Sequence, residues 1–312
     1  MPNFNGVWSL TTQLQYAADW PVFSQPRALF LGGNTGSKET VIQFIDVTTT
    51  GNASDFGDLT SGRASLMSAS SKIRAVAAGG NTGSAVNVID YVTIASEGNA
   101  SDFGDLSSTS QEGTGTGSST RGLFQLGLAT DNVNTVEYIT IASTGNATDF
   151  GDRTTTAAYG QDSAVSSPTR GVFSGGFISS SVNIIDYVTI ASTGDATDFG
   201  DTSVTRYGMG GASSSTRGVF GGGNTSGDTM DYITIASTGN ASDFGNLTNS
   251  PRYISGTSNG VRGIFGGGKV SSTRQDVIQY ITIASTGNTS DFGNLIASNF
   301  SLTATSGSHG GI

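Results

Sequence analysis

Short apolar runs separated by polar, glycine-rich tracts recur along the whole chain. Two of them are residues 217–223, Arg-Gly-Val-Phe-Gly-Gly-Gly, and residues 231–237, Asp-Tyr-Ile-Thr-Ile-Ala-Ser, both rich in β-branched and aromatic residues. The tract Thr-Gly-Asn-Ala-Ser at 238–242 supplies the Gly and Asn that tight turns require. No segment longer than about ten residues shows the 3.6-residue period of an amphipathic helix. The pattern therefore predicts an all-β protein.

The same pattern repeats six times. The tripeptide Asp-Phe-Gly begins at six positions that are 45 to 49 residues apart: Asp55, Asp102, Asp149, Asp198, Asp243 and Asp291. Each is preceded by an aromatic residue, namely Phe44, Tyr91, Tyr138, Tyr187, Tyr232 and Tyr280. An Arg lies further upstream in each copy, at Arg27, Arg74, Arg121, Arg170, Arg217 and Arg262. Repeats of about 40–50 residues with four short strands are typical of propeller blades. We therefore expect a six-bladed β-propeller of four-stranded antiparallel blades over residues 27–312, preceded by a separate segment, residues 1–26.

The ring of a propeller has to close, because an open ring leaves sheet edges that pair with other chains. Only three strands of the first blade follow one another directly along the chain. Residues 299–305, Asn-Phe-Ser-Leu-Thr-Ala-Thr, follow Asp291 by eight residues, just as Pro251 follows Asp243. We predict that this C-terminal strand completes the first blade. The alternative places residues 14–18 there.

Two hypotheses concern the polar residues of the repeat. The six Arg and the six Asp of Asp-Phe-Gly occupy matching positions, which suggests a ring of equivalent ion pairs such as Arg217 with Asp243. Five repeats carry an Asn-x-Ser/Thr sequence, for example at Asn240, which is also a glycosylation acceptor. The fourth repeat has Asp195 there, and Asp serves a turn as well as Asn but carries no glycan. We therefore expect this position to act in the turn.

Composition excludes several kinds of chemistry. The chain has 14 Lys and Arg against 24 Asp and Glu, a net charge of −10, so the clustered basic residues of a nucleic-acid site are not expected. It has no Cys, which excludes thiol nucleophiles, disulfides and Cys-based metal sites. Its one His, His309, lies near the C-terminal end, and the non-repeated acids Glu112, Asp131 and Asp162 have no supporting motif. We therefore expect no enzymatic activity, no cofactor and no metal.

Residues 1–26 contain both tryptophans of the chain, Trp8 and Trp20. Aromatic anchors are enriched at interfaces, so we interpret this segment as a docking peptide for other proteins; alternatively, the two rings cap the propeller. It lacks the basic and apolar regions of a signal peptide, and no apolar run approaches the roughly 20 residues that span a bilayer. We expect neither a signal peptide nor membrane insertion.

The Arg and Gly-Gly strand, the aromatic strand and the final turn of each blade resemble a degenerate kelch repeat. The late Trp of kelch repeats is missing, and the Phe of Asp-Phe-Gly takes its place. Kelch-like copper oxidases bind their metal through His, Tyr and a Cys-linked Tyr. Because this chain has no Cys and a single His, that activity is not carried over.

The blades resemble more closely those of kelch-like virion proteins of tailed bacteriophages, especially marine and cyanobacterial ones. The likeness covers residues 27–312 and rests on segments such as Ser-Thr-Arg-Gly-Val-Phe-Gly-Gly-Gly at 215–223 and Tyr-Ile-Thr-Ile-Ala-Ser-Thr-Gly-Asn-Ala-Ser-Asp-Phe-Gly at 232–245. The leader Gly-Val-Trp-Ser-Leu at 6–10 is similar to segments of phage tail and adhesin proteins. The resemblance implies a structural protein on the virion surface, either a tail-fibre or adhesin-type host-recognition protein or a capsid decoration.

The loops after the Gly-rich strands differ in length and sequence between repeats, whereas the Thr-Gly-Asn-Ala-Ser turns hardly vary. In a four-stranded meander these two sets of connections lie on opposite faces of the disc. Because recognition is commonly carried by variable loops on a rigid scaffold, we expect the variable loops to bind a host-surface glycan or receptor, unless they differ only by drift. The candidate partner-binding residues are Asn34, Lys38, Asn81, Asp131, Phe177, Asn224 and Lys269.

The sequence is compatible with two other functions. A glycan-degrading enzyme on the same fold requires a non-repeated pair of carboxylates about 5–9.5 Å apart in the channel. An intracellular kelch-type adaptor predicts a partner peptide at the channel mouth and no association with particles.

Overall fold

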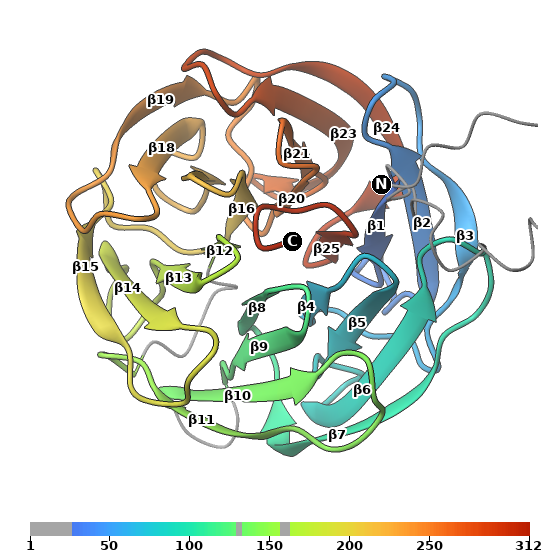
Figure 1. The fold of residues 1–312 in the computed structure, drawn as a ribbon. Helices are drawn as coiled ribbons and strands as arrows, with labels where there is room; N and C mark the ends of the chain where they lie inside the picture. Colours follow the sequence, from blue (N-terminus) through green and yellow to red (C-terminus); the bar gives the residue numbers. More distant parts are fainter. Residues whose placement is uncertain (1–26, 129–132, 157–162) are drawn as a thin grey trace, which may run out of the picture.

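The computed structural model describes residues 27–128, 133–156 and 163–312. These residues form six antiparallel sheets arranged as a ring around a central axis (Figure 1). They contain no helix, and hence none that is long and apolar enough to cross a membrane. The predicted six-bladed β-propeller is confirmed.

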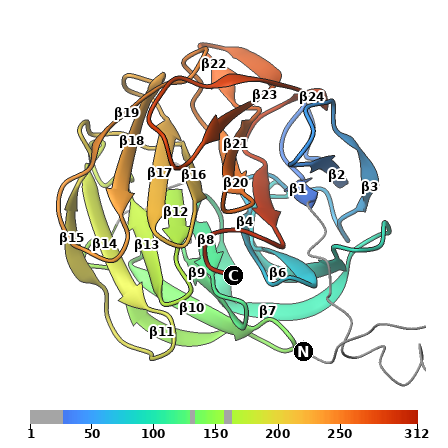
Figure 2. The same ribbon diagram turned by 45° about the horizontal axis from the view of Figure 1, so that its top comes forward.

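Each blade is a meander of four strands that runs from the axis to the rim (Figures 1 and 2). Blade 1 contains β25 (Thr303–Ser306), β1 (Arg27–Leu31), β2 (Val41–Asp46) and β3 (Ser54–Asp58). Blade 2 contains β4 (Met67–Ser70), β5 (Arg74–Ala78), β6 (Val86–Thr93) and β7 (Ser101–Ser110). Blade 3 contains β8 (Thr114–Gly117), β9 (Arg121–Gln125), β10 (Thr135–Thr140) and β11 (Thr148–Asp152).

The other three blades follow the same order from axis to rim. Blade 4 contains β12 (Ser163–Ser166), β13 (Arg170–Ser174), β14 (Ile184–Thr189) and β15 (Thr197–Asp201). Blade 5 contains β16 (Met209–Ser213), β17 (Arg217–Gly222), β18 (Thr229–Thr234) and β19 (Ser242–Asn246). Blade 6 contains β20 (Ser255–Ser258), β21 (Arg262–Gly266), β23 (Thr273–Thr282) and β24 (Ser290–Asn299), and β22 (Lys269–Val270) forms a hairpin with β23.

The ring closes through the C-terminal strand, as predicted. β25 pairs antiparallel with β1, with Ala28 opposite Ser306 and Leu31 opposite Thr303. The other edge of β1 is occupied by β2, so no edge of β1 is left for residues 14–18. Those residues lie outside the described part of the chain, but the alternative that they complete blade 1 is excluded by the pairing of β1.

The hydrophobic core lies between adjacent blades. The second strand of each blade is buried on both faces after its Arg, and the third strand contains both buried and partly exposed residues. One such core joins Val219 and Phe244 of blade 5 to Ile254, Phe265 and Ile281 of blade 6. Because every blade buries its faces against two neighbours, stability depends on the closed ring.

The repeated Arg stacks on the aromatic residue of its own blade, which corrects the hypothesis of an ion-pair ring. The guanidinium carbon lies 4.5 Å from the ring centre of Tyr232 in the case of Arg217, and 4.5–4.9 Å in all six blades. The same Arg donates to a main-chain carbonyl of the next blade, Ile283 at 3.0 Å. The Asp of Asp-Phe-Gly, such as Asp243, is exposed. The sequence pattern shows which residues repeat, but it does not show which face of its strand each residue occupies.

The Phe of Asp-Phe-Gly completes this stack. It meets the aromatic residue edge-on with ring centres 5.8–6.0 Å apart, as Phe244 does with Tyr232. Such T-shaped pairs are favourable by about 0.5–1.5 kcal/mol beyond the area that they bury. The repeated Arg, Tyr and Phe therefore form one packing unit per blade.

The Asn of the Asn-x-Ser/Thr sequence ties each turn to the neighbouring blade. Its side-chain oxygen accepts a main-chain N–H from the preceding blade's rim strand at 2.9–3.1 Å, for example from Asp201 to Asn240. Asp195 makes the same bond with Asp152 in the fourth repeat. Only the acceptor oxygen is used, which explains why Asp replaces Asn there. The side chain at this position therefore acts between blades rather than within its own turn.

A second bond between blades is buried. The residue before each repeated aromatic is 3% exposed or less. It accepts, at 2.8–3.3 Å, the main-chain N–H of the residue five positions after the Asp of Asp-Phe-Gly in the preceding blade. We call these six the clamp residues: Gln43, Asp90, Glu137, Asp186, Asp231 and Gln279.

Three clamp residues also form ion pairs that are closed off from solvent. Arg63 pairs with Asp90, Arg153 with Asp186 at 2.9 Å, and Arg206 with Asp231 at 2.7 Å, with both side chains 0% exposed in each pair. Burial lowers the pKa of the Arg206 guanidinium, and the neighbouring Asp231 opposes that shift. A buried charge is tolerated only with such a partner, so neither member can be lost alone.

The Gly of Asp-Phe-Gly is required by the close approach of neighbouring blades. Gly245 has φ +140°, and a Cβ there would overlap the carbonyl oxygen of Gly287 in the next blade. Gly239 has φ +154° but nothing within 4 Å of its Cβ position. We expect Gly245→Ala to lower the free energy of unfolding by about 1–3 kcal/mol more than Gly239→Ala, because only the former adds overlap to backbone strain. Equal losses in denaturant unfolding would contradict the close approach.

The buried pair of Arg206 and Asp231 gives a second prediction. Asp231→Asn keeps the acceptor for Ser203 but leaves the Arg206 charge unpaired, so the free energy of unfolding should fall by about 3–5 kcal/mol. Blade 6 performs the same clamp with an uncharged Gln279. The double variant Arg206→Met with Asp231→Gln should therefore regain most of the loss in denaturant unfolding. A single variant that loses less than about 1 kcal/mol would show that the pair is dispensable.

Candidate functional site

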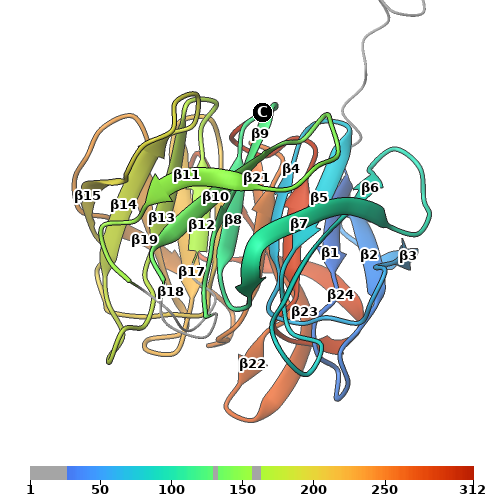
Figure 3. The ribbon, with the colours of Figure 1, turned by 90° about the horizontal axis from the view of Figure 1, so that it is seen from below.

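The disc has two faces of different character (Figure 3). The uniform face carries the turns after the first and third strands of each blade, including Thr-Gly-Asn-Ala-Ser. The variable face carries the loops after the second strands and the connections between blades. Figure 3 places the C-terminus on the uniform face and β22 on the variable face. Arg27, the first described residue, pairs with Asp46 at the uniform end of β1.

The structure brings five of the seven predicted partner-binding residues to equivalent positions. Each directly follows the Gly doublet or triplet of its blade, at the mouth of the channel on the variable face. These residues are Asn34, Asn81, Phe177, Asn224 and Lys269. Four of them form main-chain hydrogen bonds with a residue two or three positions before an axial strand: Asn34 with Phe300, Asn81 with Ala64, Asn224 with Tyr207 and Lys269 with Arg252.

The other predicted residues have different outcomes. Lys38 lies in the same loop as Asn34, and the main chains of the two residues form an isolated antiparallel β-bridge. Asp131, like the proposed docking residues Trp8 and Trp20, lies outside the described residues. Whether any of these residues binds a partner stays a prediction.

A run of four aromatic rings at the mouth was missed in the sequence. Phe177 meets Tyr207 with ring centres 5.5 Å apart, Tyr207 meets Tyr253 at 5.9 Å, and Tyr253 meets Phe300 at 6.2 Å. The four rings come from blades 4, 5, 6 and 1 and are all partly buried. Aligning the residues just before each axial strand would have shown the signal, because blades 2 and 3 have Ala64 and Gln111 where Tyr207 and Phe300 stand.

Tyr253 is the most constrained ring of this run. Its φ of 56° lies in the left-handed region that a Tyr seldom adopts, so the surrounding structure holds the ring in place. Burial, a hydrogen bond with Tyr207 and the nearby carboxylate of Glu112 raise its pKa to about 12, and Arg252 opposes this. Tyr253 is therefore a neutral hydrogen-bonding group at any physiological pH.

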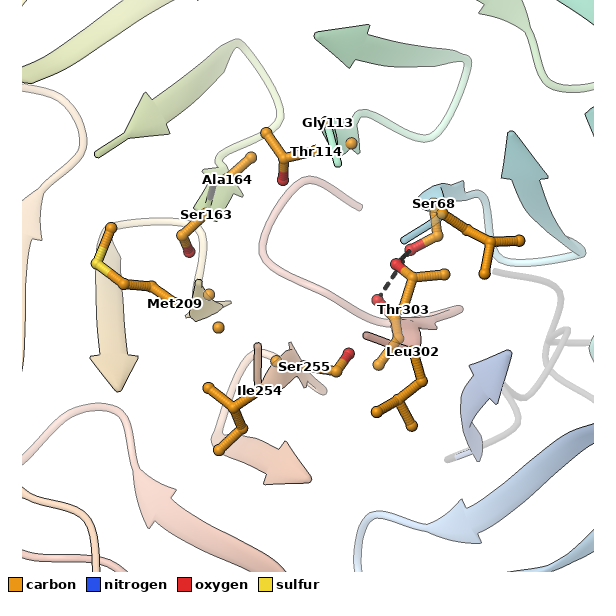
Figure 4. Close-up of a pocket in the computed structure, with 16 residues that line it drawn as sticks. Ser68, Gly113, Thr114, Ser163, Ala164, Met209, Ile254, Ser255, Leu302 and Thr303 are labelled. Atoms are coloured by element: carbon orange, nitrogen blue, oxygen red, sulfur yellow. Dashed lines mark hydrogen bonds between the residues drawn. The ribbon is translucent and has the colours of Figure 1, made fainter. Parts of the chain in front are cut away.

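The channel below the mouth is narrow and uncharged. Two cavities of about 50 Å³ each follow the axis, and small or hydroxyl-bearing residues such as Ser68, Thr114, Ser163 and Ser255 line them (Figure 4). Ser68 bonds Thr303 of the neighbouring axial strand at 2.6 Å. Spaces of this size hold a few waters rather than a sugar chain. No Asp or Glu lines either cavity within the described chain, so the carboxylate pair required of a glycan-degrading enzyme is not found there.

Residues 307–312 close the channel at the uniform face, where they follow β25 across the axis (Figure 1). His309 Nε2 lies 3.2 Å from the carbonyl oxygen of Ser70, and its Nδ1 accepts the N–H of Gly311 at 3.1 Å. The first nitrogen must carry the proton and the second must not, so the ring is neutral. Burial lowers the pKa of His309 to about 4, and the hydrogen bond that the ring donates to the Ser70 carbonyl opposes this shift.

The described residues contain no group of three or more His, Asp or Glu arranged to hold a metal ion.

No protein-family model matches the chain, and no curated protein is significantly similar to it in sequence.

The buried neutral ring of His309 predicts that the free energy of unfolding depends on pH. The unfolded chain binds a proton near pH 6.5 and the folded chain only near pH 4, so the contribution of His309 to stability is complete above pH 6.5 and is lost as the pH falls toward 4. Because the ring keeps some exposure, we expect a loss of about 1–3 kcal/mol in the free energy of unfolding. His309→Asn should not show this component, so its unfolding free energy should fall less steeply between pH 6.5 and 4. Parallel curves for the two proteins would contradict the burial of a neutral ring.

Proposed function

We propose that this protein is a non-enzymatic component of the surface of a tailed bacteriophage particle, which recognises a host-surface glycan or receptor with its variable face. The observation that carries the proposal is the difference between the two faces. Side chains that recur in all or nearly all blades, such as Arg217 and Asn240, are used in packing and in bonds between blades. The residues that differ between blades gather at the channel mouth.

The interior supports a binding role over a catalytic one. The cavities along the axis are too small for a glycan and have neither a carboxylate nor a metal cluster among their described lining residues. The variable face, in contrast, presents aromatic and basic groups on a rigid scaffold. Rigid aromatic groups beside charged side chains are typical of recognition surfaces.

The position of Arg27 supports attachment through residues 1–26. Since Arg27 lies at the uniform face, other virion proteins bound through this segment, with Trp8 and Trp20 as anchors, would hold the disc by that face. The variable face would then point away from the particle. This arrangement suits a tail-fibre or adhesin-type protein as well as a capsid decoration.

Cryo-electron microscopy of purified particles from the source tests the proposal. We expect a six-bladed disc on the particle surface with β22 directed outward and the C-terminus directed inward. Density at a tail tip or fibre would favour adhesion, and density on the capsid lattice would favour decoration. Absence of the chain from particles, checked by peptide mass spectrometry, would overturn the virion role and favour an intracellular adaptor.

A further inference from the structure

The basic residues of the chain are divided very unevenly between the faces. Of the 14 Lys and Arg, six form the Arg stacks, three form the buried ion pairs, and Lys72 lies exposed in a turn of the uniform face. The remaining four all lie on the variable face, in blade 6 and the adjoining loop of blade 1: Lys38, Arg252, Lys269 and Arg274. An acidic protein with a net charge of −10 thus places every remaining cation in one sector.

These cations surround Phe300 and Tyr253. Lys269 Nζ lies 4.6 Å from the ring centre of Phe300, and the guanidinium carbon of Arg274 lies 5.8 Å from it. Arg252 lies 5.6 Å from the ring centre of Tyr253. Lys38 belongs to the neighbouring loop of blade 1, whose Gly36 approaches Arg274. Together these six residues form what we call the Phe300 cluster.

The cations of the cluster have their hydrogen-bonding capacity unused. Every other Arg of the chain donates to a carbonyl or a carboxylate, as Arg217 and Arg206 do. Within the described residues, no side chain of Lys38, Arg252 or Lys269 donates a hydrogen bond or lies within 4.0 Å of a carboxylate, and the same holds for Arg274. The Nε atoms of Arg252 and Arg274 are buried without a hydrogen-bond partner. Unpaired basic groups that are partly removed from water favour an anion.

The main chain of the cluster, in contrast, is already paired. Arg252 and Lys269 exchange two main-chain hydrogen bonds, of 2.9 and 3.0 Å, and Asn34 N–H donates to the carbonyl of Phe300 at 2.9 Å. An extended peptide needs main-chain partners or an open strand edge, which these residues do not offer. A nucleic-acid backbone needs a longer basic track than four residues on an acidic protein. The residues of the cluster are therefore suited to a ligand with an anionic group and an apolar ring face.

We propose that the Phe300 cluster binds an acidic sugar, a pyranose unit that bears a carboxylate or a sulfate, within a surface glycan. The fork of an Arg guanidinium matches the two oxygens of a carboxylate or a sulfate, and the C–H face of the sugar packs on the aromatic rings. This inference rests on the proposed function and names the ligand class of its recognition face. The neutral Tyr253 hydroxyl supplies a further hydrogen bond for a sugar hydroxyl.

Binding of the full-length protein to defined oligosaccharides tests the proposal. The probes are an oligogalacturonate for carboxylates, a heparin-derived hexasaccharide for sulfates and a neutral dextran oligomer of similar length, each titrated calorimetrically. We expect at least one acidic probe to bind, the dextran not to bind, and the affinity to fall with added salt. Binding of neither acidic probe at millimolar concentration would overturn the proposal.

Matched variants locate the site. Lys269→Gln and Arg274→Gln should each weaken binding of the acidic probe by at least tenfold, whereas Lys72→Gln makes the same charge change on the uniform face and should leave the affinity unchanged. Thermal unfolding confirms that each variant is folded. The variant Phe300→Leu tests whether the aromatic ring of Phe300 contributes to binding of the acidic probe. If Lys72→Gln weakens binding as much as Lys269→Gln, the acidic probe is attracted by the net charge of the protein, and the Phe300 cluster is not its binding site.

Two further results separate this inference from the proposed function. Equal affinity for poly-glutamate or single-stranded DNA, lost in the same variants, would replace the sugar by an acidic peptide or a nucleic acid. If particles contain the disc and the purified protein blocks their adsorption to host cells, but Lys269→Gln blocks it equally well, the recognition role stands and the Phe300 cluster is excluded.

Discussion

One buried polar side chain in each blade accepts a main-chain N–H of the neighbouring blade, and these bonds unite six separate sheets into one molecule. Hydrophobic contact between blades is strong but has no direction, so it alone leaves the sheets free to slide. Each clamp residue receives an N–H from the preceding blade at one fixed point, and desolvation makes the loss of that bond costly. The bonds run around the ring without interruption, from Thr60 and Asp90 to Ile296 and Gln43. The spacing of blades, and hence the position of every loop at the mouth, depends on this ring of bonds.

The architecture could be predicted from the sequence because a fixed period leaves few folds to choose from, and the eight-residue offset from Asp291 even identified the closing strand. The roles of single side chains could not be predicted from the sequence. Arg217 and Asp243 repeat in step, but strand geometry puts the Arg over an aromatic ring and the Asp in solvent. The clamp residues escaped notice because their identity changes between Gln, Asp and Glu, while the requirement for an acceptor stays the same.

In the candidate site, too, some features could be predicted from the sequence and others could not. Variation between loops identified Asn34, Lys269 and their equivalents, since differences stand out against a repeat. Tyr207 and Phe300 occupy equivalent places in their blades, but Tyr253 stands one residue later, next to Arg252, so only the closed ring shows that the three rings form a row. The scaffold thereby converts small departures from the repeat into one continuous patch, while the constant residues keep the distances between blades unchanged.

The pairing of β25 with β1 also orders events during synthesis. At about 5–20 residues per second, the ribosome exposes β1 long before it exposes β25. Blades 2 to 6 have their strands in sequence and can form as they emerge, whereas blade 1 waits with an unpaired inner edge until β25 has emerged. Nascent chains on crowded ribosomes are therefore vulnerable at that edge, and the final step of folding is a contact between the two ends of the ring.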